Sequence, residues 1–233
     1  MGSVSKIHLI GGEKGGVGKS VLARVLSQYF IDRNMAYAGV DADTSHGALV
    51  RYYGDFTQAI DLRRLDSADQ IMDRALAAER RVLVDLPAQS LKALVQWMED
   101  GDVIAFARDS GIQIVLWHVT DGGFDSIELL STALKHFSDQ IRYVVVKNGG
   151  RASDFSQYEE SWGSARVGEL GGRAIDLPEL HASTMYRIDK SGQSFWAAIH
   201  ATGPDTLSPM DKQRTKIWLA RCYGALDRMG DEI

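Results

Sequence analysis

The chain has 233 residues, of which 45% are hydrophobic, a share that is typical of a globular protein with a sizeable core. Its 31 acidic and 26 basic residues give a formal net charge of -5, which does not favour binding to nucleic acid or anionic lipid by charge alone. A single cysteine, Cys222, excludes an intramolecular disulfide and a CxxC metal site. No stretch approaches the roughly 18 apolar residues of a membrane-spanning helix. We therefore expect a soluble, cytoplasmic protein.

Short runs of β-branched and aliphatic residues alternate along the chain with longer stretches of helical periodicity, which is the pattern of βαβ units. In chain order, the expected strands are 7–11, 36–41, 81–85, 112–119, 141–147 and 173–177. The expected helices are 19–33, 67–80, 90–99, 124–136 and 179–200, followed by a C-terminal helix at about 209–230. The stretches 148–171 and 201–209, rich in Gly, Ser and Asp, are expected to be loops.

This alternation predicts a single α/β domain over residues 1–233, with a doubly wound, mostly parallel sheet and helices on both faces. In such sheets, ligands bind outside the carboxyl ends of the strands, where the loops gather. Asp41, Asp85, Asp121 and Asn148 follow or end expected strands, so we expect them to lie at that edge.

A glycine-rich stretch, GGEKGGVGKS at 11–20, stands between the first strand and the first helix. Glycines let the backbone turn its N–H groups inward, and the following helix adds the positive end of its dipole, so this loop can cradle phosphate oxygens. Lys19 would reach the β- and γ-phosphates, and the Ser20 hydroxyl can ligate Mg²⁺. A glycine-rich turn with unrelated lysines is the alternative, and the strand-to-helix context argues against it. The candidate nucleotide-binding residues here are Glu13, Lys14, Gly15, Gly16, Val17, Gly18, Lys19, Ser20 and Val21.

The general phosphate-loop motif G-x-x-x-x-G-K-S/T fails at its first position, Glu13, whereas the variant K-G-G-x-G-K-S/T, with Lys14 as an additional lysine, matches fully. That variant resembles the deviant Walker A loop of the MinD/ParA class of SIMIBI-type P-loop NTPases. The resemblance implies ATP and Mg²⁺ as ligands, slow partner-stimulated hydrolysis, and an ATP-dependent homodimer in which Lys14 contacts the nucleotide of the second copy.

Two acidic segments extend the resemblance. The segment 40–43 is similar to the switch I motif of the class, in which Asp43 would orient or activate the attacking water and Asp41 would assist the metal. The segment 82–88 is similar to a Walker B strand, in which Asp85 would hold Mg²⁺ through water. The alternative for Asp41 and Asp43 is turn chemistry at a strand end. The resemblance thus implies three catalytic residues, Lys14, Lys19 and Asp43, and three metal ligands, Ser20, Asp41 and Asp85.

Two positions are candidates for contacts with the base. Asn148 ends an apolar strand, where the class often has an Asn that hydrogen-bonds the adenine edge. Pro178 follows the last expected strand, at the turn whose backbone flanks the base in the class. An Asn-Lys-x-Asp guanine motif is missing around Lys147, so we expect ATP rather than GTP.

The N-terminal part of the chain, with its loop and the helix at 21–30, is similar to the TraL/MobD-type proteins of plasmid conjugation and mobilisation. A protein partner in a plasmid transfer or partition system is therefore expected, while DNA or a membrane surface stays open without support from the net charge. Two other functions also stay open. One is a small-molecule ATP-dependent kinase or ligase on the same scaffold, similar to dethiobiotin synthetase, for which the sequence marks no substrate pocket. The other is a nucleotide-bound scaffold that does not hydrolyse, against which Asp43 argues.

Overall fold

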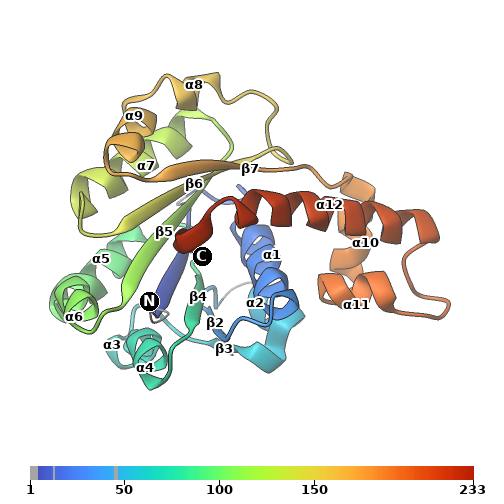
Figure 1. Ribbon diagram of the computed structural model, residues 1–233, viewed down its shortest axis with the longest axis horizontal. Helices are drawn as coiled ribbons and strands as arrows, with labels where there is room; N and C mark the ends of the chain where they lie inside the picture. The colour runs from blue at the N-terminus through green and yellow to red at the C-terminus, as the bar shows by residue number, and fades with distance from the viewer. Residues whose placement is uncertain (1–4, 13, 45–46) are drawn as a thin grey trace.

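The computed structural model describes residues 5–12, 14–44 and 47–233. Within these residues, seven strands form one sheet in the order β3-β2-β4-β1-β5-β6-β7, and every adjacent pair is parallel. The strands are β1 (Lys6–Gly11), β2 (Tyr37–Asp41), β3 (Thr57–Ala59), β4 (Arg81–Asp85), β5 (Gln113–Thr120), β6 (Arg142–Asn148) and β7 (Arg173–Leu177). Helices cover both faces of the sheet (Figure 1), which confirms the predicted doubly wound α/β class.

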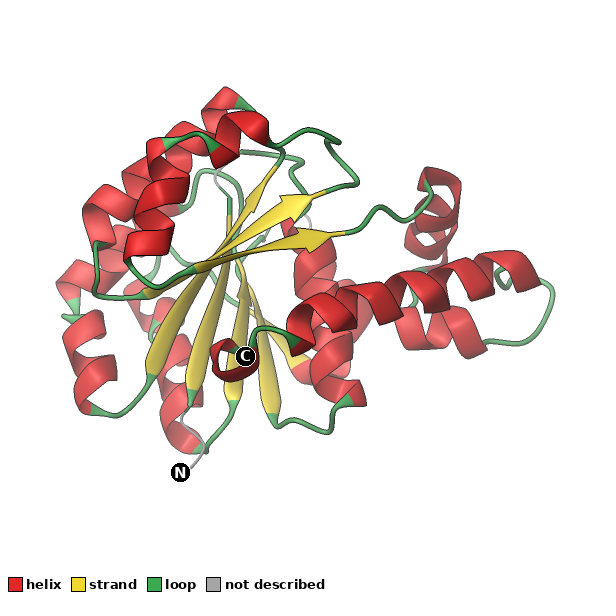
Figure 2. Cartoon of the chain, turned by 45° about the horizontal axis from the view of Figure 1, so that its top comes forward, coloured by secondary structure: helices red, strands yellow, loops and turns green. Residues whose placement is uncertain are grey.

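The helices form two layers, one on each face of the sheet, and Figure 2 shows them in red around the yellow strands. They are α1 (Lys19–Asp32), α2 (Ala48–Tyr53), α3 (Leu65–Ala68), α4 (Gln70–Ala77), α5 (Leu91–Asp100), α6 (Val103–Asp109), α7 (Phe124–Phe137), α8 (Ser156–Glu159), α9 (Trp162–Glu169), α10 (Ala182–Ser191), α11 (Phe195–His200) and α12 (Pro209–Asp227). Two 3-10 turns lie at Gly54–Phe56 and Gly230–Glu232. One core lies beneath α4, α5 and α7, and the other beneath α1 and α12.

The central strand β1 is buried along its whole length. Its alternate side chains enter opposite cores: Ile7 and Leu9 face one, and Ile10 faces the other. A strand with two buried faces carries mostly apolar residues, and in β1 the polar Lys6 and His8 are buried together with them. The strand therefore holds the glycine-rich stretch that follows it in the middle of the sheet, between β4 and β5.

Several expected elements differ from the structure. The stretch 148–171, expected to be a loop, contains α8 and α9, and the Ser161 hydroxyl caps α9 by accepting from the Ser164 N–H at 3.1 Å. The helix expected at 179–200 is two helices, because Gly192 adopts a left-handed backbone (φ 65°) and ends α10. The short elements β3, α2 and α6 were missed.

The C-terminal helix α12 begins where its capping signal is, because Ser208 Oγ accepts from the Asp211 N–H at 3.1 Å and Pro209 occupies the first turn. Together with α10 and α11, it extends beyond the sheet (Figure 1, red and orange). Cys222 is buried on its inner side, and burial raises the pKa of the thiol to about 12, so it is a structural side chain. Among the described residues, no helix combines the length and apolar character needed to cross a lipid bilayer.

Candidate functional site

The glycine-rich loop follows β1 at the carboxyl edge of the sheet. Gly12, Gly16 and Gly18 all have positive φ angles, which side chains with a Cβ rarely adopt. A Cβ on Gly18 would clash with Asn148 Nδ2, whereas one on Gly15 or Gly16 would meet no atom of the described residues within 4 Å. The loop is thus anchored on its inner side and open on its outer side, as a phosphate cradle requires. Glu13 lies outside the described residues.

Lys19 is the first residue of α1, and its side chain folds back over the loop. The Lys19 ammonium donates to the Gly12 carbonyl at 2.8 Å and to the Lys14 carbonyl at 3.2 Å, and the residue is only 8% exposed. A buried cation held by backbone carbonyls at the mouth of a loop can exchange them for anionic oxygens, which bind an ammonium more strongly. This arrangement suits a phosphate ligand.

Asp85 ends β4 directly beside Asp41 at the end of β2, since the two residues are paired in register. Both Asp85 carboxylate oxygens are buried, and neither has a hydrogen-bond partner among the described residues. Burial, together with the nearby charges of Asp41 and Asp43, raises its pKa to about 7, although Ser20 and Lys19 act in the opposite direction. Such unsatisfied buried oxygens fit a divalent cation or the water that it carries.

A cation at Asp85 would need further ligands that are not carboxylates. Within the described part of the chain, no group of three or more His, Cys, Asp or Glu side chains has a metal-binding arrangement. In nucleotide sites, Mg²⁺ keeps several waters and binds phosphate oxygens, so it takes few ligands from the protein. The Ser20 hydroxyl and the Asp85 carboxylate suit such a site.

Asp41 and Asp43 shape the segment that leads from β2 to α2. The Asp41 carboxylate accepts from the backbone N–H groups of Asp43 (3.1 Å), Leu49 (2.8 Å) and Val50 (3.0 Å), so it caps the start of α2. Burial raises the pKa of Asp41, and these N–H groups counteract that effect. The Asp43 carbonyl accepts from Gly47 N–H at 2.8 Å. The structure therefore gives Asp41 a clear structural role, and its assignment as a metal ligand stays a prediction.

Lys14 is paired within its own chain. Its ammonium donates to the Asp121 carboxylate at 2.8 Å, and the other oxygen of Asp121 accepts from Gly123 N–H at 3.1 Å. The hydrogen bond to Asp121 raises the pKa of Lys14. Sequence reasoning placed Asp121 at the correct edge of the sheet but missed its partner. The only available signal was a strand-end acid followed by two glycines, which is a common turn pattern.

The residues predicted to flank a base come together at a cavity of about 260 Å³ beside the loop. Its walls include Gly18, Val21, Asn148 and Pro178, and helix α10 completes them. The polar groups predicted to contact the base, however, form hydrogen bonds within the protein. Asn148 Nδ2 donates to the Val17 carbonyl at 2.6 Å and Asn148 Oδ1 accepts from Gly150 N–H at 3.0 Å, while the Pro178 carbonyl accepts from Trp218 Nε1 at 2.7 Å.

Two side chains of α10, Tyr186 and Asp189, line this cavity and were missed. They belong to a stretch that was predicted to be helical, and the sequence carries no signal that one face of this helix would lie toward the phosphate loop. A larger cavity of about 760 Å³ opens at the opposite edge of the sheet, where α6 and α9 meet β5 and β6. It contains none of the predicted site residues, and the strand polarity places the ligand edge on the other side.

The chain is similar in sequence to two kinds of curated protein and in fold to a solved structure. No family model matches the chain. It is 25% identical to Protein TraL of Escherichia coli, an alignment that covers 96% of the chain and 98% of TraL. It is 29% identical to Protein MobD of Acidithiobacillus ferrooxidans over 75% of the chain and 78% of MobD. Its fold matches the septum site-determining protein MinD complexed with Mg-ADP from Pyrococcus horikoshii, with a TM-score of 0.55, 16% identity, and 96% and 97% of the two chains covered.

The chain is thus similar in sequence to TraL and MobD, and it shares the fold of MinD. The predicted relation to the MinD/ParA class is thereby confirmed. The described loop residues 11–12 and 14–20, the acids at the ends of β2 and β4, and the cavity beside Asn148 all lie on one edge of the sheet. The roles of the individual residues stay predictions.

Proposed function

We propose that this TraL-related chain is an ATPase that binds Mg-ATP and acts as a dimerising switch in a plasmid transfer or partition system. It works in the cytoplasm as a single nucleotide-binding domain over residues 1–233. The MinD-type fold and the TraL and MobD relatives support a nucleotide-dependent role in such a system. The choice of ATP, the dimer and the hydrolysis are our inferences from the loop and its neighbours.

Lys19 and Asp85 carry this proposal, because each is a buried charged or chargeable group beside the phosphate loop. The Lys19 ammonium donates to two backbone carbonyls, and neither carboxylate oxygen of Asp85 has a hydrogen-bond partner within the described residues. Mg-ATP can bind both groups, because its phosphate oxygens suit the Lys19 ammonium and its hydrated cation suits the Asp85 carboxylate.

In the proposed reaction, Lys19 binds the β- and γ-phosphates, while Ser20 and Asp85 hold Mg²⁺, Asp85 through water. The bound cation would neutralise charge that develops on the phosphate oxygens. Asp43 orients a water whose oxygen forms a bond to the γ-phosphorus as the bond to the β–γ bridging oxygen breaks. ADP and phosphate are released, and the proton of the water passes to solvent or phosphate.

Hydrolysis resets a conformation rather than making a product for metabolism. In the proposed cycle, two ATP-bound copies associate through the face that carries the phosphate loop, and Lys14 of each leaves Asp121 to contact the nucleotide of the other. A protein of the transfer system would stimulate turnover. Loss of the γ-phosphate then separates the two copies.

Calorimetric titration with Mg-ATP and Mg-GTP tests nucleotide binding. Lys19→Ala should weaken ATP binding by more than about tenfold, since a charge-assisted contact contributes about 1.5–3 kcal/mol. Lys92→Ala removes an exposed lysine on α5 and serves as the control. An ATP affinity of Lys19→Ala within about threefold of wild type would contradict the site assignment.

Phosphate release from ATP in buffer alone separates the switch from a kinase or ligase. The switch releases phosphate without a second substrate, whereas a kinase or ligase releases it slowly until its metabolite is added. A strict requirement for a metabolite would overturn the proposed switch while leaving the nucleotide site intact.

A further inference from the structure

A buried arginine lies at the junction between the sheet and the C-terminal helices. Arg24 is on α1 and is only 3% exposed. Its guanidinium lies 3.7 Å from the ring centre of Tyr52 and 4.6 Å from that of Phe195, and Nη1 donates to Asp189 Oδ1 at 2.7 Å. Nε and Nη2 are buried without a hydrogen-bond partner in the described structure. Burial of a charged guanidinium with two donor nitrogens that form no such hydrogen bond lowers the stability of the fold, so it indicates a role beyond packing.

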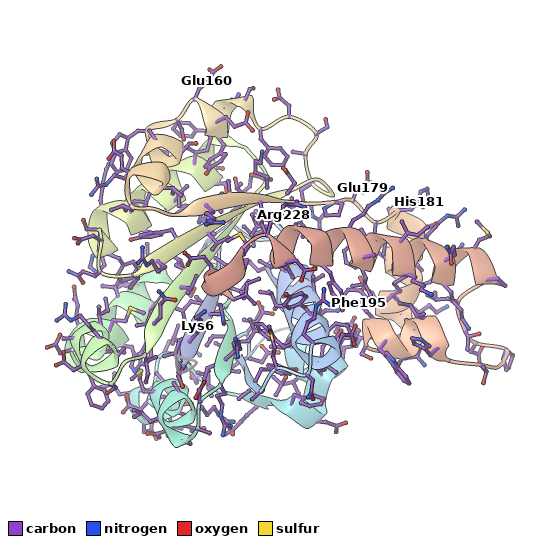
Figure 3. The ribbon with its side chains drawn as sticks, in the orientation of Figure 1. Lys6, Glu160, Glu179, His181, Phe195 and Arg228 are labelled. Carbon is purple, nitrogen blue, oxygen red and sulfur yellow. The ribbon has the colours of Figure 1, made fainter. Side chains whose placement is uncertain are left out.

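Three separate helices meet at this arginine. Tyr52 belongs to α2, Asp189 to α10 and Phe195 to α11. Figure 3 shows Phe195 at the junction between α1 and the two orange helices. Asp189 also binds α2 directly, since its carbonyl accepts from Arg51 Nη2 at 3.0 Å and from the Tyr52 hydroxyl at 3.2 Å. Asp189 is thus joined to α1 through its carboxylate and to α2 through its carbonyl.

One end of this network opens on the proposed nucleoside cavity, and the other reaches the acids at the end of β2. Asp189 lines the cavity of about 260 Å³ together with Gly18 and Val21. At the opposite end, α2 is fixed by the bonds from Leu49 and Val50 N–H to Asp41. A displacement of α10 can therefore reach the segment that contains Asp41 through rigid, hydrogen-bonded elements.

We infer that Arg24 is a positioning residue, which transmits occupancy of the nucleoside cavity to α2 and to the segment that contains Asp41 and Asp43. A base seated against α10 holds Asp189 in place. Asp189 fixes the guanidinium, and the guanidinium fixes the Tyr52 ring and with it α2. The planar guanidinium is required, because it stacks between two rings while donating to a carboxylate, which an ammonium cannot do. This inference rests on the proposed binding of a nucleotide at this edge.

Hydrogen exchange of backbone amides tests the coupling. The protein is compared with Mg²⁺ and a slowly hydrolysed ATP analogue, which has a base, and with Mg²⁺ and inorganic tripolyphosphate, which has none. In wild type, the analogue should slow exchange in α2 by at least about tenfold more than tripolyphosphate does, as expected for ordering of a local unit. In Arg24→Lys, the two ligands should protect α2 equally, while both still protect the first turn of α1.

Matched variants separate coupling from loss of stability. Arg33→Lys alters the arginine at the C-cap of α1, which is paired with Asp227 on α12, and should behave as wild type. Tyr52→Phe keeps the ring beside Arg24 but removes the bond to the Asp189 carbonyl, so it should lose part of the difference between the ligands and remain folded. Thermal unfolding of each variant without ligand reports any general destabilisation.

The outcomes are distinct. Retention of the full wild-type difference in Arg24→Lys would overturn the role of Arg24, as would equal protection of α2 by both ligands in wild type. If neither ligand protects α1 in wild type, the proposed nucleotide site itself is wrong, and the inference that rests on it is overturned as well.

Discussion

The Lys14 ammonium donates to the Asp121 carboxylate at 2.8 Å, which ties the phosphate loop to the turn after β5. The lysine proposed to act across a dimer is thus engaged within its own chain. The side chains of Lys14 and Asp121 are 37% and 21% exposed, and ion pairs with such access to water exchange partners readily. The pair therefore has the properties of a contact that is made in one state and released in another.

Removing Lys14 should separate nucleotide binding from dimerisation. Lys14→Ala should bind Mg-ATP with near-normal affinity as a monomer, form no ATP-dependent dimer and lose hydrolysis even though Asp43 is present. Analytical ultracentrifugation with Mg²⁺ and a slowly hydrolysed ATP analogue measures this, with wild type under the same conditions as the reference. A variant that dimerises as wild type does would leave only an ATP-binding α/β domain.

Removing the acid of the pair should have the opposite effect. Asp121→Asn frees Lys14 without changing the length of the side chain, so dimerisation with the ATP analogue should strengthen severalfold, because the contact within the chain no longer competes. Asp125→Asn changes a nearby acid on α7 that is not bonded to Lys14 and provides the control. Weaker dimerisation in Asp121→Asn would mean that the acid supports the interface instead.

Asp43→Ala should preserve binding and lower turnover. An acid that positions water contributes to the transition state and little to the ground state, so ATP affinity should stay within about threefold while turnover falls by at least about tenfold. Isothermal titration and phosphate release measure the two quantities on one preparation. Wild-type turnover in this variant would transfer the role to Asp41 or to a residue outside the segment.

The burial of Asp85 predicts a pH-dependent stability. Its pKa is about 7 in the folded protein, above the ordinary 3.8, so between these values the folded protein holds a proton that the unfolded chain has lost. The free energy of unfolding should therefore fall as pH rises from about 4 to about 7, and the full penalty is present above pH 7. With chelator and without nucleotide, Asp85→Asn should flatten this slope and raise Tm at pH 8 by about 4 °C or more.

Asp66→Asn is the control for this experiment, because Asp66 lies on the surface beside Arg64 and has a lowered pKa. Its slope should remain that of wild type over the same range. If Asp85→Asn keeps the wild-type slope and Tm, the carboxylate is satisfied in solution, and the argument for a cation beside it is lost.

A substitution at Asn148 can show whether its amide supports the phosphate loop or recognises the base. Both sides of its amide are bonded inside the protein, to the Val17 carbonyl and to Gly150 N–H. Asn148→Leu should therefore loosen the loop and weaken ATP and GTP alike, by roughly tenfold for a lost buried hydrogen bond. Competition binding with both nucleotides measures this. A loss confined to ATP would show that the amide turns toward adenine when the nucleotide binds.

The phosphate loop and its flanking β1 and α1 could be predicted because glycine spacing, one lysine and one hydroxyl are a local pattern with a local cause. The elements β3, α2 and α8 could not be predicted, because segments of three to six residues are too short to show the hydrophobic periodicity of a strand or helix. The pairing of Lys14 with Asp121 joins positions 107 residues apart, and the strand order alone brings them together. The split at Gly192 could have been recognised, since a glycine inside a helical pattern is also a helix-ending signal.

The strand order also sets the time at which the site can exist during synthesis. β1 is made first, yet it lies between β4 and β5, so its neighbours are completed only with Asp85 and Thr120. Until the chain has emerged from the ribosome as far as Thr120, the segment 6–11 has no complete sheet to join and the glycine-rich loop has no fixed shape. Parallel pairings between distant segments form slowly and leave apolar surface exposed meanwhile. A nascent chain shorter than about 120 residues therefore should not bind nucleotide and should depend on chaperones.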